Sequence, residues 1–178
     1  APRKLTKESQ IGLYGEVFVL SKILTKKLDS LHSDFNQEIL NEIILWKVNR
    51  YSKFDEATID LLNKINRNDE KLNQSLTVDI LLNLLNQKGV RLAMASTILR
   101  FKNPKIYQII DQRVYRFIYG KELKYSETNL KLQIDIYIDY LEKLKEVCYK
   151  YQIKFEEADR ILYNMDKDYN KDLKLKGY

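Results

Sequence analysis

Apolar residues recur at helical spacing along almost the whole chain, and this periodicity restricts it to an all-helical fold. The first such face comprises Ile11, Tyr14, Val17, Phe18, Leu20, Ile23 and Leu24. The 178 residues include only 5 Gly and 2 Pro, so few positions interrupt a helix. A chain of this length fits one domain, and we expect a single all-α domain over residues 1–178.

Capping residues and apolar stripes together predict about eight helices. They are Thr6 to Leu28, Phe35 to Asn49, a helix starting at Asp55 or Thr58, Thr77 to Asn86, Arg91 to Phe101, Gln112 to Tyr119, Ser126 to Tyr151 and Phe155 to Tyr169. The chain also contains 13 tyrosines, several of them in the last two helices. We interpret these as partly buried structural residues, with base stacking as the alternative.

Cysteine and histidine usage excludes several kinds of site. The only cysteine is Cys148 and the only histidine is His32, so no disulfide, zinc site or Cys/His nucleophile pair is expected. We expect no metal and no cofactor. No signal peptide and no apolar run of spanning length is present, so we expect a cytoplasmic protein without a membrane partner.

The net charge of +6 is concentrated in one stretch. Residues 84–116 hold seven basic residues against the single acid Asp111, whereas the two flanking segments are neutral. A local basic excess is what a surface that binds a polyanion needs. The alternative is that these side chains point in several directions and form no patch.

The turn inside this stretch is a candidate phosphate-binding site. Gly89 allows a positive φ, and a new helix begins directly after it. The unpaired amides at that helix start, together with Lys88 and Arg91, predict a seat for a phosphate group. The small residues of the following helix would let another helix or a DNA backbone approach closely.

Asp111 follows a loop and precedes the helix Gln112 to Tyr119. Its position predicts an N-cap, and its isolation among basic residues suggests a chemical role as well. Trp46 is most simply a core residue, and Lys47 and Arg50 then emerge at the helix end. The alternative is that Trp46 and Arg50 line a pocket.

The segments GVRLAMASTILRF and IIDQRVYR resemble the core of the helix-hairpin-helix DNA glycosylase superfamily. Members of that superfamily carry L-P-G-V-G-x-K-x-A in the hairpin and, after a loop, V-D-T-H-V-x-R. The matching positions are Gly89, Val90, Ala95, Leu99, Ile110, Asp111, Val114 and Arg116. The segments WKVNR and DRILYNMD are also similar to bacterial proteins that carry this core.

The resemblance implies a DNA-binding protein built around a helix-hairpin-helix core at residues 77–119. In the family the hairpin amides grip a phosphate, the damaged nucleotide is flipped out, and the aspartate stabilises charge on the sugar or assists water. Asp111 would take the catalytic role. The DNA contacts would fall on Lys88, Gly89, Val90, Arg91 and Arg113.

The sequence departs from the family pattern at two positions, and these departures limit the DNA contacts and the chemistry that the resemblance implies. Arg91 replaces the second hairpin glycine, and its guanidinium would then contact phosphate directly. Ala93 occupies the position of the lyase lysine, which leaves only a monofunctional glycosylase. A non-catalytic nucleic-acid-binding protein and a protein-interaction domain remain as alternatives.

Overall fold

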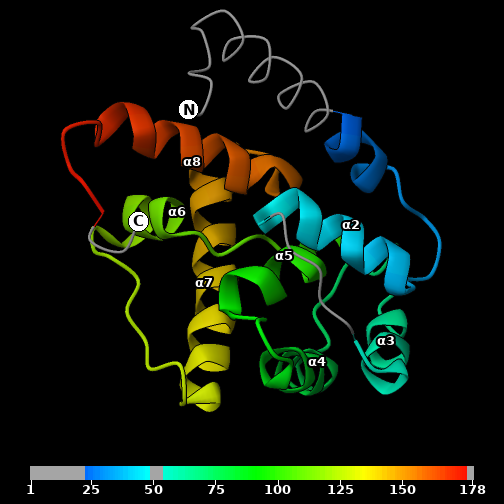
Figure 1. Cartoon of the computed structure of the whole chain (residues 1–178). Helices are drawn as coiled ribbons and strands as arrows, with labels where there is room; N and C mark the ends of the chain where they lie inside the picture. The colour runs from blue at the N-terminus through cyan, green and yellow to red at the C-terminus, as the bar shows by residue number, and fades with distance from the viewer. Residues whose placement is uncertain (1–22, 49–53, 176–178) are drawn as a thin grey trace, which may run out of the picture.

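The computed structural model describes residues 23–48 and 54–175, and every regular element within these two ranges is helical. Residues 23–29 are helical. The remaining elements are α2 (Gln37–Val48), α3 (Glu56–Asn63), α4 (Gln74–Asn86), α5 (Leu92–Lys102), α6 (Gln112–Tyr119), α7 (Leu130–Tyr151), the 3-10 helix η1 (Phe155–Glu157) and α8 (Ala158–Tyr169). The expected all-α, single-domain fold is confirmed (Figure 1).

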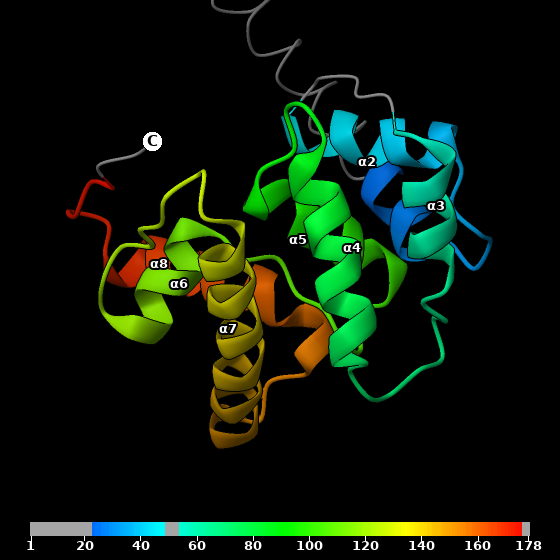
Figure 2. The same cartoon turned by 90° about the horizontal axis from the view of Figure 1, so that it is seen from below.

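The buried centre of the fold is α5, in which every residue except Ala93 is buried. Helices α2 and α4 pack against it, α4 also contacts α7, and α6 packs on both α7 and α8. Figure 2 shows α7 standing between α6 and the group formed by α2 to α5. The small residues of α5 therefore admit neighbouring helices along its length, rather than a DNA backbone.

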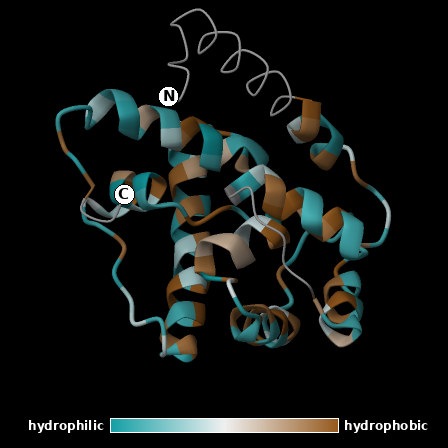
Figure 3. Ribbon diagram, viewed as in Figure 1, coloured by the Kyte–Doolittle hydropathy of each residue, from teal (hydrophilic) through white to brown (hydrophobic). Residues whose placement is uncertain are grey.

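Hydrophobic and hydrophilic residues alternate around the helices, as Figure 3 shows. This is the amphipathic pattern that helical periodicity predicts for a helix at the surface, which buries one stripe and exposes the other, whereas α5 is buried almost all round. Within the described residues, none of the helices is both long enough and apolar enough to cross a membrane.

Two of the expected helix starts are wrong. Asn73, not Thr77, caps α4, since its Oδ1 accepts a hydrogen bond from the amide of Leu76 at 3.1 Å. Thr77 instead lies inside the helix, where its buried hydroxyl forms a 2.8 Å hydrogen bond with that of Tyr107. In the same way Asn129, not Ser126, caps α7.

Other predicted boundaries agree with the structure. Asp55 caps α3 through its Oδ1, which accepts from the amide of Thr58 at 2.7 Å. Helix α6 spans the predicted range, and η1 with α8 covers the last predicted helix. Most of the helix expected from Thr6, and Arg50, lie outside the described residues.

Candidate nucleic-acid interface

The turn between α4 and α5 has the conformation that its glycine predicts. Gly89 adopts φ +85°, and a Cβ there would meet nothing within 4 Å. The glycine is therefore required by the backbone conformation and not by lack of space. Val90 is buried, and its amide donates to the carbonyl of Gln87 at 3.1 Å, which fixes the turn against the core.

Helix α5 begins without a side-chain cap. Arg91 is its N-cap residue, with an extended backbone, and makes no capping hydrogen bond. The first intrahelical bond runs from the amide of Ala95 to the carbonyl of Arg91. The amides of the first turn therefore receive no side-chain acceptor from the cap position, which is the arrangement that suits an anion.

Two exposed basic side chains flank this helix start, as the sequence predicts. Lys88 is exposed, and the Arg91 side chain is 71% exposed. Arg91 pairs with Glu127 at 2.6 Å, but the Glu127 side chain is also exposed, so the pair contributes little stability. A hollow of about 300 Å³ lies beside the turn, bordered on its other side by Tyr125, Glu127, Leu130 and Gln133.

Asp111 caps α6, which confirms the capping prediction. Its Oδ1 accepts from the amide of Arg113 at 2.8 Å, and the residue is half-buried. A carboxylate oxygen is a good hydrogen-bond acceptor for the unpaired amides at a helix start.

A buried hydroxyl links the α5 helix to the Asp111 segment. Ser96 Oγ donates to the carbonyl of Ala93 at 2.9 Å and accepts from the amide of Ile110 at 3.1 Å. On the other side of the segment, Tyr137 and Tyr140 donate from α7 to the carbonyls of residues 108 and 109, at 3.0 and 2.8 Å. These contacts fix Asp111 relative to the turn at Gly89.

The buried tyrosines have structural roles, as expected. Burial raises the pKa of both Tyr137 and Tyr140 well above the ordinary value, so the two hydroxyls remain protonated donors. Exposed tyrosines occur elsewhere, at Tyr149 and Tyr169.

Most of the basic excess of residues 84–116 is paired with acids from other parts of the chain. The ion pairs are Arg91 with Glu127, Arg100 with Asp29, Lys102 with Asp34, and both Arg113 and Arg116 with Asp166. Three of these basic residues, Arg100, Lys102 and Arg116, are buried. The stretch therefore does not form one continuous basic surface, and of its seven basic residues only Lys88, Arg91 and Lys105 are exposed.

Arg113, a predicted DNA contact, faces α8. Its Nη1 lies 3.4 Å from Asp166 Oδ2, and its guanidinium lies over the ring of Tyr163, 5.7 Å from the centroid. Because the side chain is occupied by α8, the structure separates Arg113 from the exposed cations at the turn.

Trp46 is half-buried and packs against the hydrophobic core. Its Nε1 donates to Thr25 Oγ1 at 2.7 Å, and its ring meets that of Phe101 edge-on at 5.1 Å. The ring of Trp46 therefore packs against the hydrophobic core, and Arg50 lies outside the described residues.

The structure places Lys47 close to two carboxylates that are distant from it in sequence. Burial lowers the pKa of Lys47, and the carboxylates of Asp111 and Asp159 oppose this change. Asp159 is 4% exposed, and burial raises its pKa. From the sequence, Lys47 was expected to emerge into solvent at the end of α2. The residues next to Lys47 in the sequence do not show that α8, which carries Asp159, lies close to it.

Comparison with known proteins adds no assignment. No protein-family model, curated protein or solved structure matches the chain. Among the described residues, no group of three or more His, Cys, Asp and Glu side chains is arranged to hold a metal ion. Two candidate features remain: the turn at Gly89 with the exposed cations Lys88 and Arg91, and the segment that carries Asp111.

Proposed function

We propose that this protein binds the phosphate backbone of DNA at the turn between α4 and α5, which acts as a helix-hairpin-helix. The observation that carries the proposal is the uncapped start of α5 behind a positive-φ glycine, flanked by exposed Lys88 and Arg91. Amides at a helix start and adjacent cations together suit a phosphate oxygen.

Salt-dependent binding to a fluorescent DNA duplex tests this function. Arg91→Gln and Lys88→Gln should each weaken binding and reduce the slope of log affinity against log salt by about 1, because each removes one phosphate contact. Glu127→Gln should strengthen binding, since it releases Arg91 from its ion pair. Lys105→Gln is the matched control, because Lys105 is exposed beyond the opposite end of α5.

Binding that is absent at low salt, or equal in all four variants, would contradict the phosphate seat. A second duplex with an abasic-site analogue shows whether the protein prefers a nucleotide that is already extruded. Such a preference would indicate a glycosylase-like function and justify a test of base release from duplexes that carry damaged bases.

We further propose that Asp111 assists hydrolysis of an N-glycosidic bond in a damaged nucleotide, without a lyase step. Ser96, Tyr137 and Tyr140 hold its segment in place, and its carboxylate acts to raise the pKa of Lys47. A carboxylate fixed in this way can stabilise positive charge that develops on the sugar.

Asp111→Asn separates this chemical role from capping. Asparagine caps helices about as well as aspartate, so the variant should fold and bind DNA normally but lose base release from duplexes that carry damaged bases. Unchanged release would eliminate Asp111 from the chemistry. Tight DNA binding by the unaltered protein without release of any damaged base tried would favour a non-catalytic nucleic-acid-binding protein.

The second candidate function is that of a non-catalytic nucleic-acid-binding or protein-interaction domain. Arg100, Arg113 and Arg116 form ion pairs with Asp29 and Asp166. These ion pairs favour the second candidate, because they leave only a small basic surface for DNA. In this case Asp111 is only the cap of α6.

A further inference from the structure

A second polar hollow, with a volume of about 300 Å³, lies at the far end of α5. It is formed by residues 31–35, residues 63–68 and Lys102, the last residue of α5. With a rise of 1.5 Å per residue, Lys102 lies roughly 15 Å along the helix from its start at the Gly89 turn. The two sites are therefore separate.

Lys102 is a buried amine built into the wall of this hollow. The residue is only 5% exposed, and its Nζ donates to Asn63 Oδ1 at 2.8 Å and lies 4.6 Å from the centroid of the Phe35 ring. Asn63 is itself fixed, because it accepts from the amide of Phe35 and donates to the carbonyl of the same residue. Burial lowers the pKa of Lys102, and Asp34 opposes that change.

The charges around the hollow favour an anion. Lys64, Arg67 and Lys102 line it, against the single carboxylate of Asp34. Asp34 is a weak partner for Lys102, since their Nζ and Oδ1 atoms are 3.7 Å apart and the Asp34 side chain is 83% exposed. Arg67 is held nearby by hydrogen bonds to the carbonyls of Phe101 and Asp29.

We propose that this hollow binds a phosphate group, with Lys102 as its principal charged donor. An ammonium group has three protons to donate, and one of them is committed to Asn63. A phosphate would replace the long contact to Asp34 with a short, charge-assisted hydrogen bond in a partly desolvated position. The volume suits a small ligand, either free phosphate or the terminal phosphate of a nucleic-acid strand.

Phosphorus NMR titration and calorimetry with inorganic phosphate, in a chloride buffer, test the proposal. The unaltered protein should show saturable binding, and Lys102→Met should weaken it about tenfold or more through loss of a charged hydrogen bond. Methionine keeps the apolar stem of the side chain, so the variant should remain folded, which circular dichroism verifies.

Two further variants sharpen the result. Asp34→Asn should tighten phosphate binding about two- to fivefold by removing the competing carboxylate. Lys105→Met should leave it unchanged, because Lys105 is exposed and does not line the hollow. No binding by the unaltered protein, or equal binding by Lys102→Met, overturns the proposal.

A trinucleotide with a 5′-phosphate, compared with the same trinucleotide ending in a 5′-hydroxyl, identifies the source of the phosphate. Lys102-dependent binding of only the phosphorylated form assigns the hollow to strand ends. Binding of inorganic phosphate without either trinucleotide assigns it to the free ion. Since Arg91→Gln should not alter either result, failure here is distinguishable from failure of the proposed function.

Discussion

Asp166 forms ion pairs with Arg113 and Arg116, so these two arginines of the basic stretch are not free to contact DNA. It is fully buried, and its carboxylate receives Arg116 Nε at 2.9 Å and Arg116 Nη2 at 2.5 Å. Burial alone would raise the pKa of the Asp166 carboxyl, but the hydrogen bonds from Arg116 and Asn170 outweigh it and hold that pKa below the ordinary value. Asp166 is therefore ionised in the folded protein at neutral pH.

This pairing makes part of the stability depend on pH. Because the pKa of Asp166 is lower in the folded state than the unfolded value of about 3.9, its contribution is complete above roughly pH 5. It should be lost as the pH falls through about 4 toward the folded pKa. Urea unfolding measured between neutral pH and pH 3 checks the direction.

Arg116→Met tests whether the buried pair causes this dependence. At neutral pH the variant should lose about 3–5 kcal/mol, because it leaves a buried carboxylate without its main partner. The difference from the unaltered protein should shrink below about pH 4. The double variant Arg116→Met/Asp166→Asn should be more stable than Arg116→Met; equal stability would show that the buried charge is not the cause.

At the scale of elements, the turn between α4 and α5 and the end of α6 offer a matched pair of glycines. Gly89 and Gly120 both have positive φ, +85° and +66°, and a Cβ at either position would meet nothing within 4 Å. Alanine should therefore cost about 1–2 kcal/mol of stability at each position through backbone strain alone. Thermal or urea unfolding of the two variants measures this.

DNA binding should distinguish the two substitutions. Gly89→Ala distorts the amides that precede α5, so it should weaken binding to the duplex, whereas Gly120→Ala should bind normally. Equal binding by both variants would show that the conformation of the turn is unimportant for phosphate recognition, even if both lose stability as expected.

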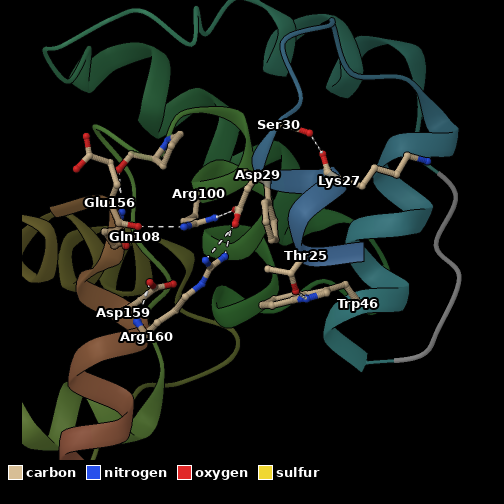
Figure 4. A network of polar contacts seen from close by, with 12 residues as sticks. Thr25, Lys27, Asp29, Ser30, Trp46, Arg100, Gln108, Glu156, Asp159 and Arg160 are labelled. Carbon is tan, nitrogen blue, oxygen red and sulfur yellow. Dashed lines mark hydrogen bonds and ion pairs between the residues drawn. The ribbon is translucent and has the colours of Figure 1, made fainter. Parts of the chain in front are cut away.

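At the scale of the whole molecule, Asp29 joins parts of the chain that are far apart in sequence (Figure 4). Its carboxylate pairs with Arg100 of α5 and, at 3.0 and 3.1 Å, with both Nη atoms of Arg160 in α8. Its backbone carbonyl accepts from Arg67. Burial would raise the pKa of Asp29, but the hydrogen bonds from Arg160 and Arg100 outweigh it and lower that pKa.

Asp29→Asn should cost about 2–3 kcal/mol at neutral pH, since it leaves the buried guanidinium of Arg100 without a charged partner. Urea unfolding followed by circular dichroism gives the value. Asp34→Asn is the control, because the Asp34 side chain is exposed and its ion pair with Lys102 is long. The stability of this variant should be nearly unchanged. Similar losses in both variants would contradict the central role of Asp29.

The sequence by itself determined the all-α class, most helix ranges, the cap Asp111 and the turn at Gly89, and it limited the start of α3 to Asp55 or Thr58. These features are local, because they follow from side-chain periodicity, from a capping oxygen within three residues, or from the φ that glycine permits. The helix starts at Thr77 and Ser126 were wrong because Asn73 and Asn129, a few residues earlier, supply the capping oxygens.

The tertiary structure alone decided which charges remain available to a ligand. Seven basic residues in residues 84–116 predicted a basic surface, but five of them pair with acids from distant segments, namely Asp29, Asp34, Glu127 and Asp166. The surroundings of Lys47 also depend on distant segments, because Asp111 and Asp159 of α8 lie close enough to affect its pKa. Charge counts along a sequence are local, whereas burial and ion pairing depend on which helices meet in space.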